Sequence, residues 1–267
     1  MDKKIIIIGG DKRFIYLKKM LQTTFEVIPF TDRDALIHFY NNIEDADVVL
    51  LPYPITFDGE TVNAPLYKKT VLLSDVFSHL KPKHILLTGG KLPREFHAEE
   101  ICRTYDYAAS EELLWANAKL TAEGLLRLVI EELPTALSAT SVAVLGAGRV
   151  GTETAKLLLR AGCEVTIFAR STKDFETKVL PFDYFIQHAQ SFDSVINTVP
   201  ALVLDEQRLC ALRPDCLILE AASAPYGLDF RVADRHGIKS IIAGSLPGKT
   251  APKTAAEIIC KSVLKLC

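Results

Sequence analysis

Short apolar runs and helical patterns alternate along the whole chain. In its first part, runs rich in branched aliphatic residues lie at residues 4–8, 25–28, 47–51, 70–73 and 84–87. Continuous runs of this kind are typical of parallel strands that are buried on both faces. Between the first two runs, Phe14, Leu17 and Leu21 recur at helical spacing, which completes a β-α-β start.

A second set of strands follows a long helix. Apolar residues keep helical spacing from Ser110, a suitable N-cap, to Leu133, which precedes Pro134. Further strands are predicted at residues 141–145, 164–168, 194–197, 216–220 and 239–242, with a helix over 150–161 and a last amphipathic helix over 254–266.

These elements predict an α/β fold of two Rossmann-like parallel-sheet domains joined by a long helix. Residues 1–110 are expected to form the first domain, completed by helices 111–133 and 250–267, so that the C-terminal helix packs back on it. Residues 134–246 are expected to form the second domain.

Composition and charge exclude several classes of function. The 267 residues are 49% hydrophobic and 24% charged, and 31 basic residues against 33 acidic ones leave a net charge of −2. No general field attracts a polyanion, so we expect no nucleic-acid partner. No apolar run approaches the roughly 20 residues that span a bilayer, which predicts a cytoplasmic protein without a membrane partner. The six cysteines form no C-x-x-C pair, so we expect no metal site.

The motif with the clearest chemistry is Gly146-Ala147-Gly148-Arg149-Val150-Gly151, a G-x-G-x-x-G turn between a strand and a helix. In such a turn the first glycine makes the tight bend, the second lets the backbone approach a pyrophosphate, and the third lets helix and strand pack closely. The helix N-terminus then presents free N–H groups to the phosphates. We predict a nicotinamide dinucleotide bound at Gly146, Gly148, Arg149, Val150 and Gly151.

The end of the next strand indicates which dinucleotide binds. An NAD site usually has an acidic residue there, whereas Ala169-Arg170-Ser171-Thr172-Lys173 is basic and rich in hydroxyls. Arg170 can pair bidentately with a 2′-phosphate and Ser171 can donate to it, which favours NADP over NAD. A solvated basic loop is the alternative interpretation.

The turn Asn197-Thr198-Val199-Pro200 follows a later strand of the same domain. The carboxyl ends of parallel strands line the ligand crevice, so this turn is expected to border the nicotinamide, with Thr198 as a candidate ribose or carboxamide contact. A loop in which proline ends the strand explains the same residues equally well.

Several segments resemble one family. Residues 246–256, Leu-Pro-Gly-Lys-Thr-Ala-Pro-Lys-Thr-Ala-Ala, resemble the L-P-G-K-x-A-P-K-T-A signature of the A subunits of dipicolinate synthase. Residues 9–13 resemble the G-G-D-x-R turn of this family, residues 196–204 its I-N-T-x-P-A-L-V-L stretch, and residues 169–171 the basic end of its second Rossmann strand. The resemblance covers essentially the whole chain, although Ala256 stands where the family has glycine.

The resemblance implies an enzyme of endospore formation in the mother-cell cytoplasm that acts with a flavoprotein partner, the B subunit of dipicolinate synthase. Together they are expected to convert the dihydrodipicolinate synthase product into dipicolinate, by loss of water and a two-electron oxidation that aromatises the ring. An NADP cofactor fits the oxidation step. The oligomeric state stays open, a homo-oligomer included.

The implied substrate is a cyclic dicarboxylate, so its site should supply fixed positive charge and backbone donors. Arg13, which follows Gly10 at a helix start, is expected to take one carboxylate together with the N–H groups of that turn. Lys249 and Lys253 are expected to take the other, or one of them to transfer a proton. A solvated surface position is the alternative for each charged residue.

Two further residues have a chemical and a structural interpretation. Asp11 is a candidate general acid or base for removal of the ring hydroxyl, and an N-cap of the following helix is the alternative. Tyr53 is a candidate substrate contact, and a rigid loop is its alternative.

For the whole chain, two other functions stay open. One is a non-catalytic NADP-binding module of the complex, and the other is an NADP-dependent dehydrogenase of another small carboxylate.

Overall fold

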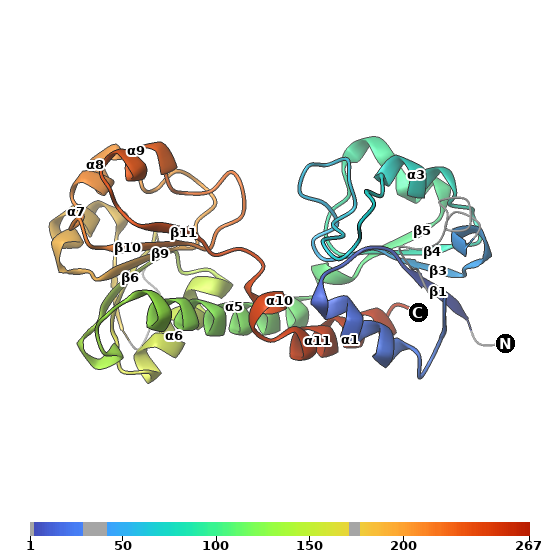
Figure 1. The fold of residues 1–267 in the computed structure, drawn as a ribbon, viewed down its shortest axis with the longest axis horizontal. Coiled ribbons are helices and arrows are strands. Elements are labelled where there is room, and N and C mark those ends of the chain that lie inside the picture. The colour runs from blue at the N-terminus through green and yellow to red at the C-terminus, as the bar shows by residue number, and fades with distance from the viewer. Residues whose placement is uncertain (1–2, 29–41, 171–176) are drawn as a thin grey trace. The chain divides into compact units, whose positions relative to one another are not determined.

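The computed structural model describes residues 3–28, 42–170 and 177–267. The chain divides into two compact units, shown in Figure 1, each an α/β fold on its own parallel sheet. The first unit comprises residues 1–114 and 251–267, and the second comprises residues 115–250. The predicted fold class is confirmed.

In the described residues, the first unit contains a five-stranded sheet in the order β2-β1-β3-β4-β5, with every neighbouring pair parallel. Its strands are β1 (Lys4–Ile7), β2 (Glu26–Ile28), β3 (Val48–Leu50), β4 (Ile85–Thr88) and β5 (Arg103–Asp106). Its helices include α1 (Lys12–Leu21), α3 (Leu73–Ser78), α4 (Ala98–Ile101), the start of α5 (Glu111–Glu132) and α11 (Pro252–Leu264).

The two faces of this sheet bury separate cores because side chains alternate along each strand. Ile5 and Ile7 of β1 pack into one core with residues of α1, α5 and α11. Ile6 and Ile8 pack into the other with residues of α3 and α4. Helix α11 lies against α1, so the prediction that the C-terminal helix packs on the first domain is confirmed.

In the described residues, the second unit contains a six-stranded parallel sheet in the order β11-β10-β9-β6-β7-β8. Its strands are β6 (Ser141–Leu145), β7 (Glu164–Phe168), β8 (Lys178–Leu180), β9 (Ser194–Asn197), β10 (Leu217–Glu220) and β11 (Ser240–Ile242). Its helices include α6 (Arg149–Arg160), α7 (Phe185–His188), α8 (Glu206–Cys210), α9 (Phe230–Arg235) and α10 (Leu246–Thr250).

Helices cover both faces of the second sheet (Figure 1). Leu125 of α5 and Leu158 of α6 pack on one face, while Phe185 of α7, Leu209 of α8 and Val232 of α9 pack on the other. This is the doubly wound arrangement typical of dinucleotide-binding domains.

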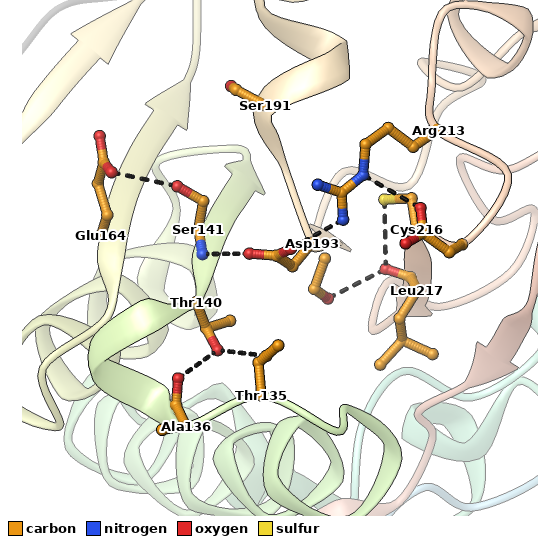
Figure 2. A network of polar contacts seen from close by, with 12 residues as sticks. Thr135, Ala136, Thr140, Ser141, Glu164, Ser191, Asp193, Arg213, Cys216 and Leu217 are labelled. Carbon is orange, nitrogen blue, oxygen red and sulfur yellow. Dashed lines mark hydrogen bonds and ion pairs between the residues drawn. The ribbon is translucent and has the colours of Figure 1, made fainter.

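A polar network holds the amino ends of the strands in the second sheet, as Figure 2 shows. The Asp193 carboxylate accepts the Ser141 N–H at 2.7 Å and an Arg213 guanidinium N–H at 2.8 Å. Arg213 also donates to Asp215 at 3.1 Å, and the Ser141 hydroxyl donates to Glu164 at 3.3 Å. At this edge Arg213 is therefore paired with both Asp193 and Asp215.

The opposite, carboxyl-terminal edge of each sheet contains a topological switch point. In the first sheet the strand order reverses between β1 and β3, and in the second between β6 and β9. Ligands of open parallel sheets bind outside the carboxyl ends of the strands at such points. The turns after these four strands are therefore the places to look for a site.

One predicted strand is wrong. Residues 70–73 form only an isolated bridge between Leu72 and Thr61, and α3 begins at Leu73. Leu73, Val76 and Phe77 are buried at the helical spacing i, i+3, i+4, so the apolar run opens a helix. The short strands β5 and β8 and the short helices α3, α4, α7, α8, α9 and α10 were not predicted.

None of the helices in the described residues combines the length and the apolar composition that a membrane crossing requires.

Helix α5 contains one position where only glycine fits. A Cβ on Gly124 would lie 2.7 Å from Cβ of Leu246, the residue that opens α10. Gly124→Ala is therefore expected to lower the free energy of unfolding by about 1–3 kcal/mol through overpacking. The higher helix propensity of alanine alone would raise the free energy of unfolding by about 1 kcal/mol. The sign of the measured change therefore shows whether overpacking or helix propensity dominates.

Urea denaturation followed by circular dichroism measures this effect. The control is Glu123→Ala at the exposed neighbouring position, expected to change stability by less than about 0.5 kcal/mol. If Gly124→Ala were as stable as the parent protein, Leu246 of α10 would not pack closely against Gly124 of α5.

Candidate functional site

The glycine turn joins β6 to α6 at the switch point of the second sheet. Gly146 has a φ of +101°, and a Cβ there would lie 2.6 Å from the Thr198 hydroxyl oxygen. A Cβ on Gly151 would lie 2.1 Å from the carbonyl oxygen of Gly146. Both positions need glycine because the helix and the turn touch there.

Gly148 is different, because no described residue fills the space beside it. It is the N-cap of α6 and makes no side-chain cap, and among the described residues no atom would lie within 4 Å of a Cβ on it. Arg149 and Val150 follow it as the first residues of α6, and Arg149 is exposed. The uncapped end of a helix carries partial positive charge and N–H donors. A phosphate group fits this place, as the motif predicts.

The turn after β9 supports the glycine turn. Thr198 donates its N–H and its hydroxyl to the Leu145 carbonyl at the end of β6, at 2.9 and 2.7 Å. Val199 packs beside Gly146, and Pro200 is exposed. The Thr198 hydroxyl proton is thus used to hold β6 and β9 together at their carboxyl ends.

Asn197 is fully buried and bonded on all sides. Its amide nitrogen donates to both carboxylate oxygens of Glu220, at 2.8 and 2.9 Å, and to the Val199 carbonyl at 3.0 Å. Its side-chain oxygen accepts the Val199 N–H at 3.0 Å. Asn197 therefore shapes the turn from within, through hydrogen bonds to Glu220 and Val199.

Glu220, at the end of β10, is a polar residue of this edge that the sequence motifs do not include. It is fully buried, and it also accepts N–H groups from Ala222 at 3.0 Å and Gly227 at 3.2 Å. Burial raises the pKa of the Glu220 carboxyl, while the hydrogen bonds from Asn197 and the backbone act in the opposite direction. The signal in the sequence was a glutamate that ends an otherwise apolar strand.

The predicted 2′-phosphate site lies at the end of β7 and is described only in part. Arg170 is exposed there. Ser171 lies outside the described residues.

A second polar group lies at the switch point of the first sheet. The Asp11 carboxylate accepts the Arg13 N–H at 3.0 Å, so Asp11 is the N-cap of α1. The same carboxylate accepts from Arg13 Nε at 2.9 and 3.1 Å. Arg13 Nη2 donates to the Tyr53 carbonyl, and the guanidinium carbon lies 5.7 Å from the centre of the Tyr53 ring. The N-cap interpretation of Asp11 is confirmed.

Arg13 is only 4% exposed, yet one edge of its guanidinium is unused. Nε and Nη2 are bonded to Asp11 and Tyr53. In the part of the chain that the structure describes, Nη1 has no bonded acceptor and is not closed off from the surface. A guanidinium held from two sides with a free edge is preorganised for a carboxylate.

The backbone N–H groups of the preceding turn are not available for the same ligand. Gly9 donates to the Tyr67 hydroxyl at 3.0 Å, and Gly10 donates to the Asn63 carbonyl at 2.8 Å. The N–H groups of Gly9 and Gly10 are therefore used within the protein, and this turn places Asp11 and Arg13 at the start of α1.

The backbone next to Tyr53 is fixed by a buried tyrosine. The Tyr107 hydroxyl donates to the Leu51 carbonyl at 2.9 Å, and burial raises the pKa of Tyr107 well above its ordinary value. A Cβ on Gly89 would lie 2.2 Å from the Pro52 carbonyl oxygen, so the ends of β3 and β4 approach closely. These contacts hold the carbonyl to which Arg13 donates.

Lys249 and Lys253 come from the last two helices of the described residues. Lys249 lies in α10 of the second unit and Lys253 in the first turn of α11 of the first unit, and both are exposed. The structure thus brings together Gly10, Asp11, Arg13 and Tyr53 among the predicted substrate residues.

Known proteins match both units. Residues 4–107 match the N-terminal domain of the dipicolinate synthase A subunit. Across 98% of its length the chain is 29% identical to the dipicolinate synthase A subunit of Bacillus subtilis (strain 168), 95% of which is covered. The resemblance to the dipicolinate synthase A subunit is confirmed. Two crystal structures bearing that name agree in fold.

The structure of the dipicolinate synthase A subunit from Bacillus halodurans has a TM-score of 0.87 at 25% identity, covering 100% of this chain and 98% of that one. The structure of the dipicolinate synthase A chain from Bacillus subtilis has a TM-score of 0.82 at 25% identity, covering 100% and 96%. Residues 109–224 match the NAD-binding domain of D-isomer specific 2-hydroxyacid dehydrogenases. This match supports a nicotinamide cofactor and an oxidoreductase.

Two alanine substitutions separate the roles of the glycines. Gly148→Ala is expected to leave the melting temperature unchanged, because its Cβ enters open space, and to weaken cofactor binding at least about tenfold, or about 1.4 kcal/mol. Gly151→Ala is expected to lower both the melting temperature and the cofactor affinity, because its Cβ would meet the Gly146 carbonyl oxygen.

Differential scanning calorimetry gives the melting temperatures, and isothermal titration calorimetry gives the cofactor affinities. Undiminished cofactor binding by Gly148→Ala would place the pyrophosphate elsewhere.

Proposed function

We propose that the chain is the A subunit of a dipicolinate synthase of sporulating bacteria. In this proposal it oxidises the dihydrodipicolinate synthase product to dipicolinate in an NADP-dependent reaction, together with a flavoprotein partner. The observation that carries the proposal is the agreement with the dipicolinate synthase A subunit over 98% of the chain. An enzyme with an A subunit has at least one further, different subunit.

The second unit would hold the cofactor. The open N-terminus of α6 at Gly148 suits the pyrophosphate, and Arg170 with Ser171 would take the 2′-phosphate of NADP. When bound, the nicotinamide ring supplies the hydride acceptor. Thr198 and Asn197 keep the glycine turn and the neighbouring strand end in place for it.

The first unit would hold the substrate through its carboxylates. The free edge of Arg13 is fixed in advance by Asp11 and Tyr53, so little side-chain freedom is lost when a carboxylate binds. Asp11 also balances the charge of Arg13, and we assign it to positioning that guanidinium. Lys249 and Lys253 remain our candidates for the second carboxylate or for proton transfer.

The net chemistry balances without a further reactant. Loss of water from the hydrated intermediate leaves a dihydropyridine ring, and removal of a hydride and a proton makes the ring aromatic. A bound nicotinamide would accept the hydride, and a base or water would accept the proton.

The proposal is tested by dipicolinate formation from freshly generated dihydrodipicolinate synthase product. The assay contains this chain and the flavoprotein partner, each omitted in turn, with NADP, NAD or neither. Product that depends on this chain and forms faster with NADP is the expected result. Product formed equally well without this chain would overturn the proposal.

The same assay addresses the two alternatives. A non-catalytic cofactor module would tolerate substitution of Arg13, whereas the proposed enzyme would not. A dehydrogenase of another small carboxylate would show comparable or higher activity with that compound and NADP than in dipicolinate formation.

Arg13→Lys tests the carboxylate site. Lysine keeps the charge but cannot bond Asp11, Tyr53 and a substrate carboxylate in one plane, so we expect kcat/KM to fall about 10- to 100-fold, or about 1.5–3 kcal/mol. Cofactor affinity, measured by calorimetry, should not change.

The control is Lys12→Ala, at the exposed neighbouring position in α1. Full turnover by Arg13→Lys would move the carboxylate site away from this switch point.

Arg170→Ala tests the choice of cofactor. Loss of a charged hydrogen bond to the 2′-phosphate is expected to weaken NADP binding by about 1.5–3 kcal/mol and to leave NAD binding unchanged. Arg160→Ala, which removes an exposed charge elsewhere in the same unit, is the matched control. An equal loss for both dinucleotides would argue against 2′-phosphate recognition by Arg170.

A further inference from the structure

A buried carboxylate lies at the ligand edge of the second sheet. Glu220 ends β10 and is 0% exposed. Its oxygens accept from the Asn197 amide at 2.8 and 2.9 Å, from the Ala222 N–H at 3.0 Å and from the Gly227 N–H at 3.2 Å. These contacts involve residues of β9, β10 and the loop that follows β10.

The contacts favour the ionised carboxylate. Every partner of both oxygens is a hydrogen-bond donor, and a protonated oxygen would direct its own hydrogen at one of these donors. Ionised oxygens can accept all of them, as buried carboxylates with several backbone donors do.

No cation in the described residues forms an ion pair with this carboxylate. Asp193, at the amino-terminal edge of the same sheet, differs in this respect, because Arg213 bonds it at 2.8 Å (Figure 2). Buried charges in proteins are normally paired, since an unpaired one is costly. The partner of Glu220 is therefore to be sought in a ligand.

The position of Glu220 in the sheet indicates which end of a bound dinucleotide would lie nearest to it. In a doubly wound sheet the dinucleotide lies across the switch point, with the pyrophosphate on the first glycine turn and one mononucleotide over each half. By this rule the half that contains β7 would take the adenosine end, so the half that contains β9 and β10 would face the nicotinamide. The nicotinamide ring is a cation when oxidised and neutral when reduced.

We propose that the Glu220 carboxylate is the counter-charge of the oxidised nicotinamide ring, so that this unit binds the oxidised cofactor in preference to the reduced one. This inference rests on the cofactor function proposed for the unit. An oxidation consumes the oxidised form, and the buried charge would select it and favour release of the reduced product. Glu220 acts here through its field, without a hydrogen bond to the ring.

The test compares the affinities of the full-length protein for NADP⁺ and NADPH by isothermal titration calorimetry. Glu220→Gln removes the charge and keeps the size of the side chain. We expect the affinity for NADP⁺ to fall about tenfold relative to that for NADPH. Any local disturbance from the new amide would weaken both forms alike, so the ratio isolates the charge.

Two further variants sharpen the comparison. Glu164→Gln removes a carboxylate from the exposed amino end of β7 in the same unit, and it should leave the ratio unchanged. Glu220→Asp keeps the charge on a shorter chain, and it should retain the preference for NADP⁺ even if both affinities fall.

The outcomes separate this inference from the function on which it rests. Equal weakening of NADP⁺ and NADPH by Glu220→Gln, or a parent protein that binds NADPH more tightly, would overturn the inference and leave cofactor binding intact. Should Glu220→Gln fail to fold, the parent protein and Glu220→Asp still decide the question through their own ratios. Failure of the parent protein to bind either form would instead overturn the cofactor assignment.

Discussion

The parallel direction of every strand pair is the constraint on which the sites depend. In a parallel sheet all carboxyl ends lie at one edge, so the turns that follow the strands gather there whatever their separation in sequence. This edge brings Asp11 and Arg13 beside Tyr53, about 40 residues later, through the neighbouring strands β1 and β3. In the second unit it brings the glycine turn to Thr198 through β6 and β9.

The carboxylates at the two edges of the second sheet differ in whether they have a cationic partner. At the amino-terminal edge, Asp193 is neutralised by Arg213 and is bound to the backbone of β6, which suits a purely structural role. At the carboxyl-terminal edge, Glu220 is held by neutral donors alone among the described residues. In the first unit the charge is only partly enclosed. Asp11 neutralises Arg13, and one side of the guanidinium stays unbonded among the described residues.

Most of the fold could be predicted because long apolar runs and helical spacing dominate the chain. The prediction errors concern short elements, because a helix or strand of a few residues contains too few apolar positions to show a clear periodicity. The apolar run that ends at Leu73 leads into a helix, and a run of three apolar residues is too short to distinguish a helix from a strand. Strand β5, with the sequence Arg-Thr-Tyr-Asp, lies at the sheet edge, where polar side chains are tolerated and the apolar signal disappears.

The candidate sites were predictable to different degrees. The glycine turn has a fixed spacing with a mechanical reason for each glycine, and the structure reproduces those reasons at Gly146 and Gly151. Asn197 and Glu220 depend on a contact between two strand ends that are 23 residues apart, and no local pattern encodes it. For the same reason, a charged residue such as Arg13 cannot be assigned as buried until its partners are known.

The packing of α11 against α1 has a consequence for the order of folding during synthesis. The core of the first unit includes Ile259 and Val263 of α11, so this unit cannot complete its core until α11 has left the ribosome. The second unit is continuous from residue 115 to 250 and can fold before that. The unit that contains β1 to β5 can therefore complete its core only after all residues of the second unit have been synthesised.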